Sequence, residues 1–224
     1  AIFLGDYIDR GPDSAAVVEH LIRFRDQAAC ETIFLRGNHE DALISLVEGL
    51  AESAHWLDFG GRETMASYGV SERALKEDLA ALRSQIGLAI PDTHLQFLRA
   101  TEIWVEVGDY LFVHAGLDPQ KPLEAQTLED MLWGRHDDVD RIPVWPHVVV
   151  HGHTVYPRPV LGYGRIGIDT GAYASDCLTA VRLEGARQDF LKISVDKRSG
   201  EVVCEPWTDL DRTSPAAMAA LSEI

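Results

Sequence analysis

Four short apolar segments of this chain each run directly into a cluster of carboxylate, amide or imidazole side chains, most of them beside a glycine. In chain order the clusters are Gly5-Asp6-Tyr-Ile-Asp9-Arg10-Gly11, Gly37-Asn38-His39-Glu40, His114-Ala-Gly116 and His151-Gly-His153-Thr154. Polar groups that follow buried strands gather at the carboxyl edge of a sheet, so we expect the four clusters to face one shared crevice. This pattern requires a layered fold of strands and helices.

The segments between the clusters alternate in the manner of such a fold. Ala1–Leu4 and Thr32–Leu35 are typical of buried strands. The helix expected between them is capped by Asp13 and has apolar residues at helical spacing, namely Val17, Leu21, Phe24 and Ala28. From residue 41 to about residue 101 the pattern is mostly helical, with an irregular glycine-rich interruption at Trp56–Gly69.

The second half of the chain is rich in strand patterns. Ile103–Val107 and Tyr110–Val113 flank a Gly-Asp turn and predict a β-hairpin. Further strands are expected at His147–Val150 and Arg165–Ile168, and an antiparallel pair at Cys177–Leu183 and Phe190–Val195. No internal repeat or Pro/Ser-rich linker interrupts the 224 residues, so we predict a single domain, residues 1–224, of the α/β (α+β) class with two packed sheets flanked by helices.

Composition excludes several classes of partner. The chain has 36 acidic and 20 basic residues and a formal net charge of −16, which disfavours binding to nucleic acid or to an anionic membrane surface. No apolar run approaches the roughly 18 residues needed to cross a bilayer. The three scattered cysteines do not make a disulfide framework and suit a reducing compartment. A cytoplasmic location is therefore expected, and we also expect a monomer.

The donor atoms in the four clusters point to a metal site. A mixture of carboxylate, amide-oxygen and imidazole ligands suits Mn²⁺, Fe or Zn²⁺, whereas a thiolate site would need cysteines. The neighbouring glycines allow sharp turns and leave room for an anionic substrate. Each cluster alone is weak evidence, since Asp6 and its neighbours could form an ordinary helix-capping turn. Four clusters in this order are much stronger evidence.

The sequence resembles the calcineurin-like metallophosphoesterases of the phosphoprotein phosphatase (PPP) type, closest to the small bacterial and phage-lambda-like serine/threonine protein phosphatases. The motifs GDxxDRG, GNHE, HAG and GHT carry the resemblance over nearly the whole chain. It implies a four-layer β-sandwich flanked by helices, with a helical insertion after GNHE. It also implies two divalent metal ions, with Mn²⁺ expected, that activate a water for in-line attack on phosphorus.

The resemblance also implies residue roles. Asp6 is expected to bridge the two metals, and the second metal is completed by Asn38, His114 and His153. His39 is the expected acid that protonates the leaving oxygen, with Asp9 holding its ring. Arg10 and Arg135 are expected to grip the phosphate. Alternatives remain open: Asp9 and Arg10 could pair at the surface, His39 could be structural, and the Trp-Gly-Arg135 tripeptide could occur by chance.

The family's first motif, GDxHG, supplies an Asp and a His to the first metal and does not precede Asp6 in this chain. We therefore expect an N-terminally incomplete copy that lacks its first strand–helix unit, so the first-metal site keeps only Asp6. A GDxHG motif encoded upstream of Ala1 would support this interpretation.

The expected function is metal-dependent hydrolysis of phosphomonoesters, with a phosphorylated protein or a small phosphoester as substrate. Symmetrical cleavage of diadenosine tetraphosphate is an alternative, although the enzymes with that activity usually lack the second Asp of GDxxDRG. A further alternative, from another class, is a catalytically impaired module that binds phosphoproteins. Two remaining residues have open roles: His151 could touch substrate or bond to the backbone, and Asp169 could orient a ligand histidine or stabilise a turn.

Overall fold

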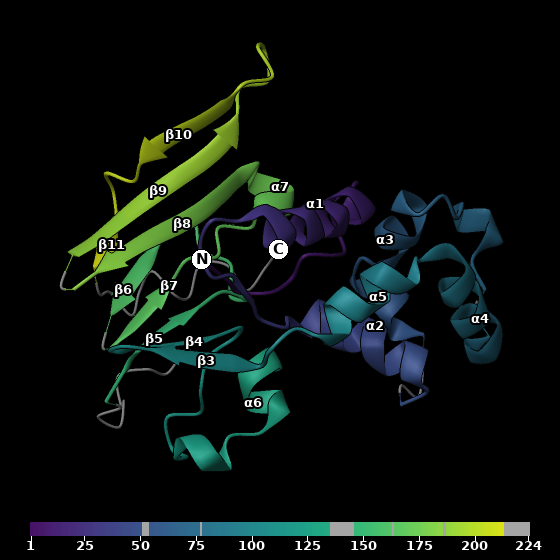
Figure 1. Ribbon diagram of the computed structural model, residues 1–224, viewed down its shortest axis with the longest axis horizontal. Helices are drawn as coiled ribbons and strands as arrows, with labels where there is room; N and C mark the ends of the chain where they lie inside the picture. The colour runs from purple at the N-terminus through teal and green to yellow at the C-terminus, as the bar shows by residue number, and fades with distance from the viewer. Residues whose placement is uncertain (51–53, 77, 135–145, 163, 186, 213–224) are drawn as a thin grey trace. The chain divides into compact units, whose positions relative to one another are not determined.

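The structure is a computed structural model that describes residues 1–50, 54–76, 78–134, 146–162, 164–185 and 187–212 (Figure 1). The chain divides into two compact units, residues 1–103 and 104–224, which are described one at a time. No helix among the described residues is long and apolar enough to cross a membrane. The three cysteines are unpaired, as expected.

The first unit begins with a strand–helix–strand motif. Strands β1 (Ile2–Phe3) and β2 (Ile33–Phe34) pair in parallel, and helix α1 (Ser14–Gln27) connects them. The rest of the unit is helical: α2 (Asn38–Glu48), the 3₁₀ helix η1 (His55–Phe59), α3 (Gly61–Ser67), the 3₁₀ helix η2 (Glu72–Ala74), α4 (Leu79–Ala89) and α5 (Asp92–Arg99). This confirms the predicted helical insertion after the GNHE motif.

Three local expectations in this unit differ from the structure. The stretch Trp56–Gly69 is helical for most of its length, because Gly60, at φ 113°, ends η1 and allows α3 to begin at once. In α1 Leu21 is buried as predicted, but Val18 is buried in place of Val17, which is 42% exposed, and Phe24 is 37% exposed. Asp13 is at the N-cap of α1, but its side chain makes no capping hydrogen bond.

The core of the first unit is made by its helices and by the second strand. Buried residues from α1, α2, α3, α4 and α5 pack together, and among them Val18, Leu43, Leu46, Met65, Leu82 and Ile86 have no exposed surface. An aromatic group extends this core, with Phe3 stacked on Phe34 at 4.8 Å between ring centroids. Burial of this apolar surface stabilises the packed helices, and the loops after β1 and β2 are anchored to them.

The second unit contains two sheets. The six-stranded sheet has the order β11-β6-β7-β5-β4-β3 and the three-stranded sheet the order β10-β9-β8 (Figure 1). Their strands are β3 (Trp104–Val107), β4 (Tyr110–Val113), β5 (Val148–His151), β6 (Val160–Gly162), β7 (Arg165–Gly167), β8 (Cys177–Glu184), β9 (Arg187–Val195), β10 (Val202–Pro206) and β11 (Asp211–Arg212). Its helices are short: the 3₁₀ helix η3 (Leu123–Ala125), α6 (Leu128–Trp133) and α7 (Ala172–Ser175).

The pairing confirms the predicted hairpin and antiparallel pair. Strands β3 and β4 pair antiparallel with Val107 opposite Tyr110, and β8 and β9 pair antiparallel with Val181 opposite Phe190. Three strands, β6, β10 and β11, were not predicted; they are short, and little alternation of apolar and polar residues marks them. The mixed α/β class with several sheets is as expected.

The register of the six-stranded sheet decides where its polar clusters lie. Strands β4, β5 and β7 are parallel neighbours, with Phe112 opposite Val150 and His151 opposite Gly167. The residues that follow them, from His114, Gly152 and Ile168 onward, therefore leave the sheet at the same edge.

Candidate metal centre and acid pair

The loop after β1 adopts a strained backbone. Five described residues other than glycine have a left-handed φ, and four of them are predicted site residues: Asp6 (58°), Asp9 (77°), Arg10 (61°) and His153 (60°). This conformation costs a non-glycine residue roughly 1 kcal/mol or more, and it concentrates where function requires a fixed direction of the side chain. The strain therefore marks the same positions as the motifs.

Glycines bring the first two clusters of the first unit into contact. A Cβ atom on Gly5, which has φ 95°, would lie 2.5 Å from the backbone nitrogen of Gly37. A Cβ atom on Gly37 would overlap the Asp6 carboxylate and lie 2.7 Å from Oε2 of Glu40. These glycines are needed for the close approach of the two loops. The sequence predicts only that they allow sharp turns and leave room for a substrate.

Glu40 holds both loops from a position with no exposed surface. Its carboxylate accepts hydrogen bonds from the backbone N–H groups of Asp6 (2.8 Å), Tyr7 (2.7 Å), Ile8 (3.2 Å) and Gly37 (2.8 Å). A charged acceptor makes each such bond stronger than one between neutral groups. Glu40 therefore fixes the backbone of the loop at Asp6.

The structure brings together the two residues of the predicted acid pair. Nδ1 of His39 lies 2.7 Å from Oδ2 of Asp9, and both side chains are buried. A carboxylate can only accept, so Nδ1 carries the proton in this bond and Nε2 faces away from Asp9. The burial of Asp9 contradicts the alternative in which it pairs with Arg10 at the surface, since Asp9 is 7% exposed.

The surroundings raise the pKa of both members of the pair. For Asp9 burial is the largest cause and raises the pKa, while hydrogen bonds from His39, Thr64 and Trp56 oppose it. For His39 burial lowers the pKa, but the hydrogen bond to Asp9 and the charges of Asp6, Asp9 and Glu40 outweigh it, so the pKa is raised. A histidine with a raised pKa keeps its proton nearer neutral pH, as an acid must.

The other predicted residues of the first unit lie close to this pair. Asn38 is the first residue of α2 and is buried, and the backbone N–H of His39 donates to Oδ1 of Asp6 at 3.4 Å. Arg10 is exposed, and its backbone N–H donates to the carbonyl of Gly60 at 3.3 Å. Arg135 lies outside the described residues.

In the second unit the predicted ligands His114 and His153 lie side by side. Their ring centroids are 5.1 Å apart with an angle of 69° between the planes, and His114 is 1% exposed. The backbone N–H of Gly152 donates to the carbonyl of His114 at 2.8 Å, which joins the ends of the two strands. The parallel register of β4 and β5 therefore places two imidazoles at one point of the sheet edge.

Two neighbouring residues with open roles have structural partners. Nδ1 of His151 donates to the carbonyl of Gly152 at 3.1 Å, and burial lowers the pKa of His151 to about 3, so it is neutral and bonded to the backbone. The Asp169 carboxylate accepts from the backbone N–H of Gly171 at 2.8 Å, which is a turn-stabilising bond.

The donor set fits a borderline divalent cation. In the first unit a carboxylate and an amide oxygen lie on adjoining loops, and in the second two imidazoles converge. Such mixed oxygen and nitrogen ligands are typical of Mn²⁺, Fe or Zn²⁺. When bound, these ions polarise a phosphoryl oxygen and lower the pKa of water.

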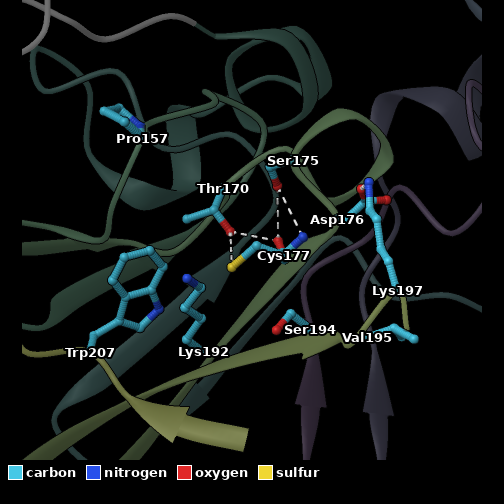
Figure 2. A pocket seen from close by; sticks show the side chains of 10 residues that line it. All are labelled: Pro157, Thr170, Ser175, Asp176, Cys177, Lys192, Ser194, Val195, Lys197 and Trp207. Atoms are coloured by element: carbon cyan, nitrogen blue, oxygen red, sulfur yellow. Dashed lines mark hydrogen bonds and ion pairs between the residues drawn. The ribbon is translucent and has the colours of Figure 1, made fainter. Parts of the chain in front are cut away.

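A cavity of about 390 Å³ lies elsewhere in the second unit and contains none of the predicted site residues (Figure 2). Most of its polar groups are bonded to one another: the Thr170 hydroxyl donates to the carbonyl of Cys177, and Lys197 pairs with Asp176. Lys192 is half-buried, and its ammonium lies 5.5 Å from the centroid of the Trp207 ring. The cavity therefore offers few polar groups to a ligand.

The residues that hold the site in place were not predicted from the sequence. Glu40 could have been found, because an acidic residue at the third position of a helix commonly bonds back to the backbone at the cap, as it does to Gly37 here. Trp56 and Thr64, which bond to Asp9 from 47 and 55 residues away, give no local signal.

The sequence of this chain is similar to those of known proteins with two different activities. The chain is 24% identical over 200 residues to an asymmetrical bis(5'-nucleosyl)-tetraphosphatase PrpE of Anoxybacillus flavithermus, covering 80% of this chain and 74% of that one. It is 27% identical over 128 residues to a zinc-dependent endopolyphosphatase of Saccharomyces cerevisiae, covering 53% of this chain and 38% of that relative.

The fold has a counterpart among solved structures, and the sequence matches a family model. A protein serine/threonine phosphatase from Saccharomyces cerevisiae with similarity to human phosphatase PP5 superimposes with a TM-score of 0.53 at 16% identity, covering 95% of this chain and 71% of that one. The family model of calcineurin-like phosphoesterases matches residues 1–180. This chain therefore belongs to the calcineurin-like phosphoesterases, a family of hydrolases that work with two metal ions.

Proposed function

We propose that this protein is a metal-dependent phosphomonoester hydrolase that acts on phosphoserine or phosphothreonine in proteins. The observation that carries the proposal is the buried pair of Asp9 and His39, with 2.7 Å between Oδ2 and Nδ1. An alkoxide leaving from phosphorus needs a proton, and a histidine held by a carboxylate supplies one. The phosphate oxygen of a nucleotide that leaves from a polyphosphate is a far weaker base than an alkoxide, so its departure depends much less on protonation by an acid.

The roles that we propose for the remaining residues are those that the family resemblance implies. Asp6, Asn38, His114 and His153 would be the ligands of one of the two metal ions. Arg10 and Arg135 grip the phosphate oxygens, for which the guanidinium fork is well suited. Mn²⁺ is the metal we expect. We also propose that the protein is a cytoplasmic monomer and that its substrate is a phosphorylated protein.

The experiment supplies the purified protein with Mn²⁺ and compares two substrates at equal concentration, a phosphoserine peptide and diadenosine tetraphosphate. We expect inorganic phosphate from the peptide at a higher kcat/KM than any product from the dinucleotide. A clear preference for the dinucleotide would overturn the proposal. Binding of the phosphopeptide without turnover would favour the phosphoprotein-binding module instead.

The second candidate is hydrolysis of dinucleoside tetraphosphates. The similarity to the PrpE tetraphosphatase over 80% of this chain favours it. The products separate its two forms, because symmetrical cleavage gives two nucleoside diphosphates and asymmetrical cleavage gives a monophosphate and a triphosphate. The metal requirement is tested in the same assay by replacing Mn²⁺ with Zn²⁺ or Fe²⁺.

A further inference from the structure

The helical insertion supplies two side chains that donate hydrogen bonds to Asp9. Nε1 of Trp56, in η1, donates to Oδ2 of Asp9 at 2.9 Å. The hydroxyl of Thr64, in α3, donates to Oδ1 at 2.5 Å. Trp56 is 3% exposed and Thr64 is fully buried, so water is not available to replace either donor.

The proton of the Thr64 hydroxyl is committed to this bond. A hydroxyl has one proton, and the same oxygen accepts the backbone N–H of Asp9 at 2.9 Å. Ser14 lies 3.1 Å from the Thr64 oxygen, so Ser14 must be the donor in that contact. The result is a directed chain of hydrogen bonds from Ser14 through Thr64 to the Asp9 carboxylate.

The glycines of the insertion show that this contact is closely fitted. A Cβ atom on Gly61 would lie 2.6 Å from the ring carbons of Trp56, and one on Gly60 would lie 2.8 Å from Cγ of Arg10. Only glycine at both positions lets the insertion reach Asp9 and Arg10 together.

Both oxygens of the Asp9 carboxylate are thus fixed in direction. Oδ1 accepts from Thr64, and Oδ2 accepts from Trp56 and from Nδ1 of His39. With its carboxylate held in this way, Asp9 can hold the imidazole in one tautomer and one orientation, with Nε2 as the atom that gives up a proton. Without Thr64, the Asp9 carboxylate could rotate away from His39.

We propose that Trp56 and Thr64 are positioning residues for the acid pair, through which the helical insertion controls how well the enzyme cleaves esters with poor leaving groups. This inference rests on the proposed function and extends it to residues outside the four motifs. A substrate whose leaving group is itself acidic needs no proton from His39. The effect of losing Thr64 must therefore depend on the leaving group.

The test compares Thr64→Val, which keeps the shape and removes the hydroxyl, with Thr64→Ser, which restores it. Each variant is given dinitrophenyl phosphate, phenyl phosphate and a phosphoserine peptide with Mn²⁺. For Thr64→Val we expect kcat to fall about 10-fold or more on the phenyl ester and the peptide, by less than about 2-fold on the dinitrophenyl ester, and KM to stay constant. Thr64→Ser should recover most of the loss.

The matched control is Tyr68→Phe. Tyr68 follows the same helix, but its hydroxyl bonds to Nδ1 of His94 at 2.8 Å and not to Asp9. It should leave the dependence on the leaving group unchanged. If Thr64→Val lowers kcat equally on all three esters, or if Tyr68→Phe has the same profile, the residue acts on the fold alone and the inference is overturned.

A second measurement does not require turnover. The proton on Nδ1 of His39 should give a low-field NMR resonance protected from exchange, because it is buried in a bond to a carboxylate. We expect this resonance to persist in Thr64→Ser and Tyr68→Phe and to broaden or vanish in Thr64→Val. An unchanged resonance in Thr64→Val would contradict the inference, whether or not the wild-type protein hydrolyses monoesters. Failure of the wild-type protein to hydrolyse any monoester would instead refute only the proposed function.

Discussion

The two units hold their predicted site residues by different means. In the first unit the loop that contains Asp6 and Asp9 is fixed by buried side chains, chiefly the carboxylate of Glu40 and the hydroxyl of Thr64. In the second unit His114 and His153 follow parallel strands, and a bond between backbone groups joins the strand ends. One arrangement depends on side chains, and the other depends on the sheet.

This difference predicts how far the effect of a single substitution extends in each unit. Removing the Glu40 carboxylate in the first unit takes the acceptor from four buried or partly buried backbone N–H groups. Removing an imidazole in the second unit leaves every backbone bond of the sheet in place. In the first unit a substitution should therefore lower both activity and the stability of the loop. In the second unit it should remove a predicted ligand and change the stability little.

The largest expected effect separates two roles within the first unit. His39→Asn and Asp6→Asn should each lower kcat by about 100-fold or more, because one removes the acid that we propose and the other a metal ligand that we propose. His39→Asn should leave the bound metal nearly constant, while Asp6→Asn should lower it, as measured by elemental analysis of the dialysed protein. Loss of metal from His39→Asn would show that His39 is a ligand and not the acid.

The next effect tests the dependence on buried side chains. Glu40→Ala should lower the free energy of unfolding by about 3 kcal/mol or more, since it leaves N–H groups of Asp6, Tyr7, Ile8 and Gly37 without their acceptor. Urea denaturation measures the change. The control is Glu48→Ala, whose side chain is 42% exposed and pairs with Arg99, and which should cost about 0.5 kcal/mol or less. Equal losses from the two variants would contradict the comparison.

A smaller effect on stability is expected in the second unit. His153→Asn should weaken metal binding yet change the free energy of unfolding of the metal-free protein by less than about 1 kcal/mol. Asparagine tolerates the left-handed φ of 60° at this position, and the bond from Gly152 to the His114 carbonyl involves only backbone. Metal titration and urea denaturation on the same sample give both values. A large loss of stability would mean that the imidazole itself supports the sheet edge.

The smallest effect depends on pH. Partial burial raises the pKa of the Asp130 carboxyl, but hydrogen bonds from Lys121 and Thr127 outweigh it and lower the pKa from 3.8 to about 2. A lowered carboxyl pKa stabilises the folded state above pH about 4, and that contribution disappears as the pH falls toward 2.

Asp130→Asn should therefore cost about 0.5–1 kcal/mol at pH 7, and the difference from wild type should shrink between pH 4 and pH 2.5. Urea denaturation at a series of pH values would detect it. A difference that stays constant over that range would show that the ionised form of Asp130 contributes nothing.

The sequence was sufficient for the positions of most elements and for the candidate ligands, because each cluster follows a strand and each strand has an apolar pattern. The prediction that Asp9 and His39 pair came from the family resemblance, and the distance between them agrees with it. Contacts over long sequence separation could not be predicted, because the bonds from Trp56 and Thr64 to Asp9 exist only once the insertion has folded.

The left-handed residues of the first loop have a consequence for protein engineering. Arg10 is exposed and has φ 61°, so a library selected only for thermal stability should favour glycine or asparagine there. Such a selection would remove the phosphate-gripping side chain that we propose for this position. Thermostable variants of this protein should therefore be screened for turnover at each round, with position 10 held constant.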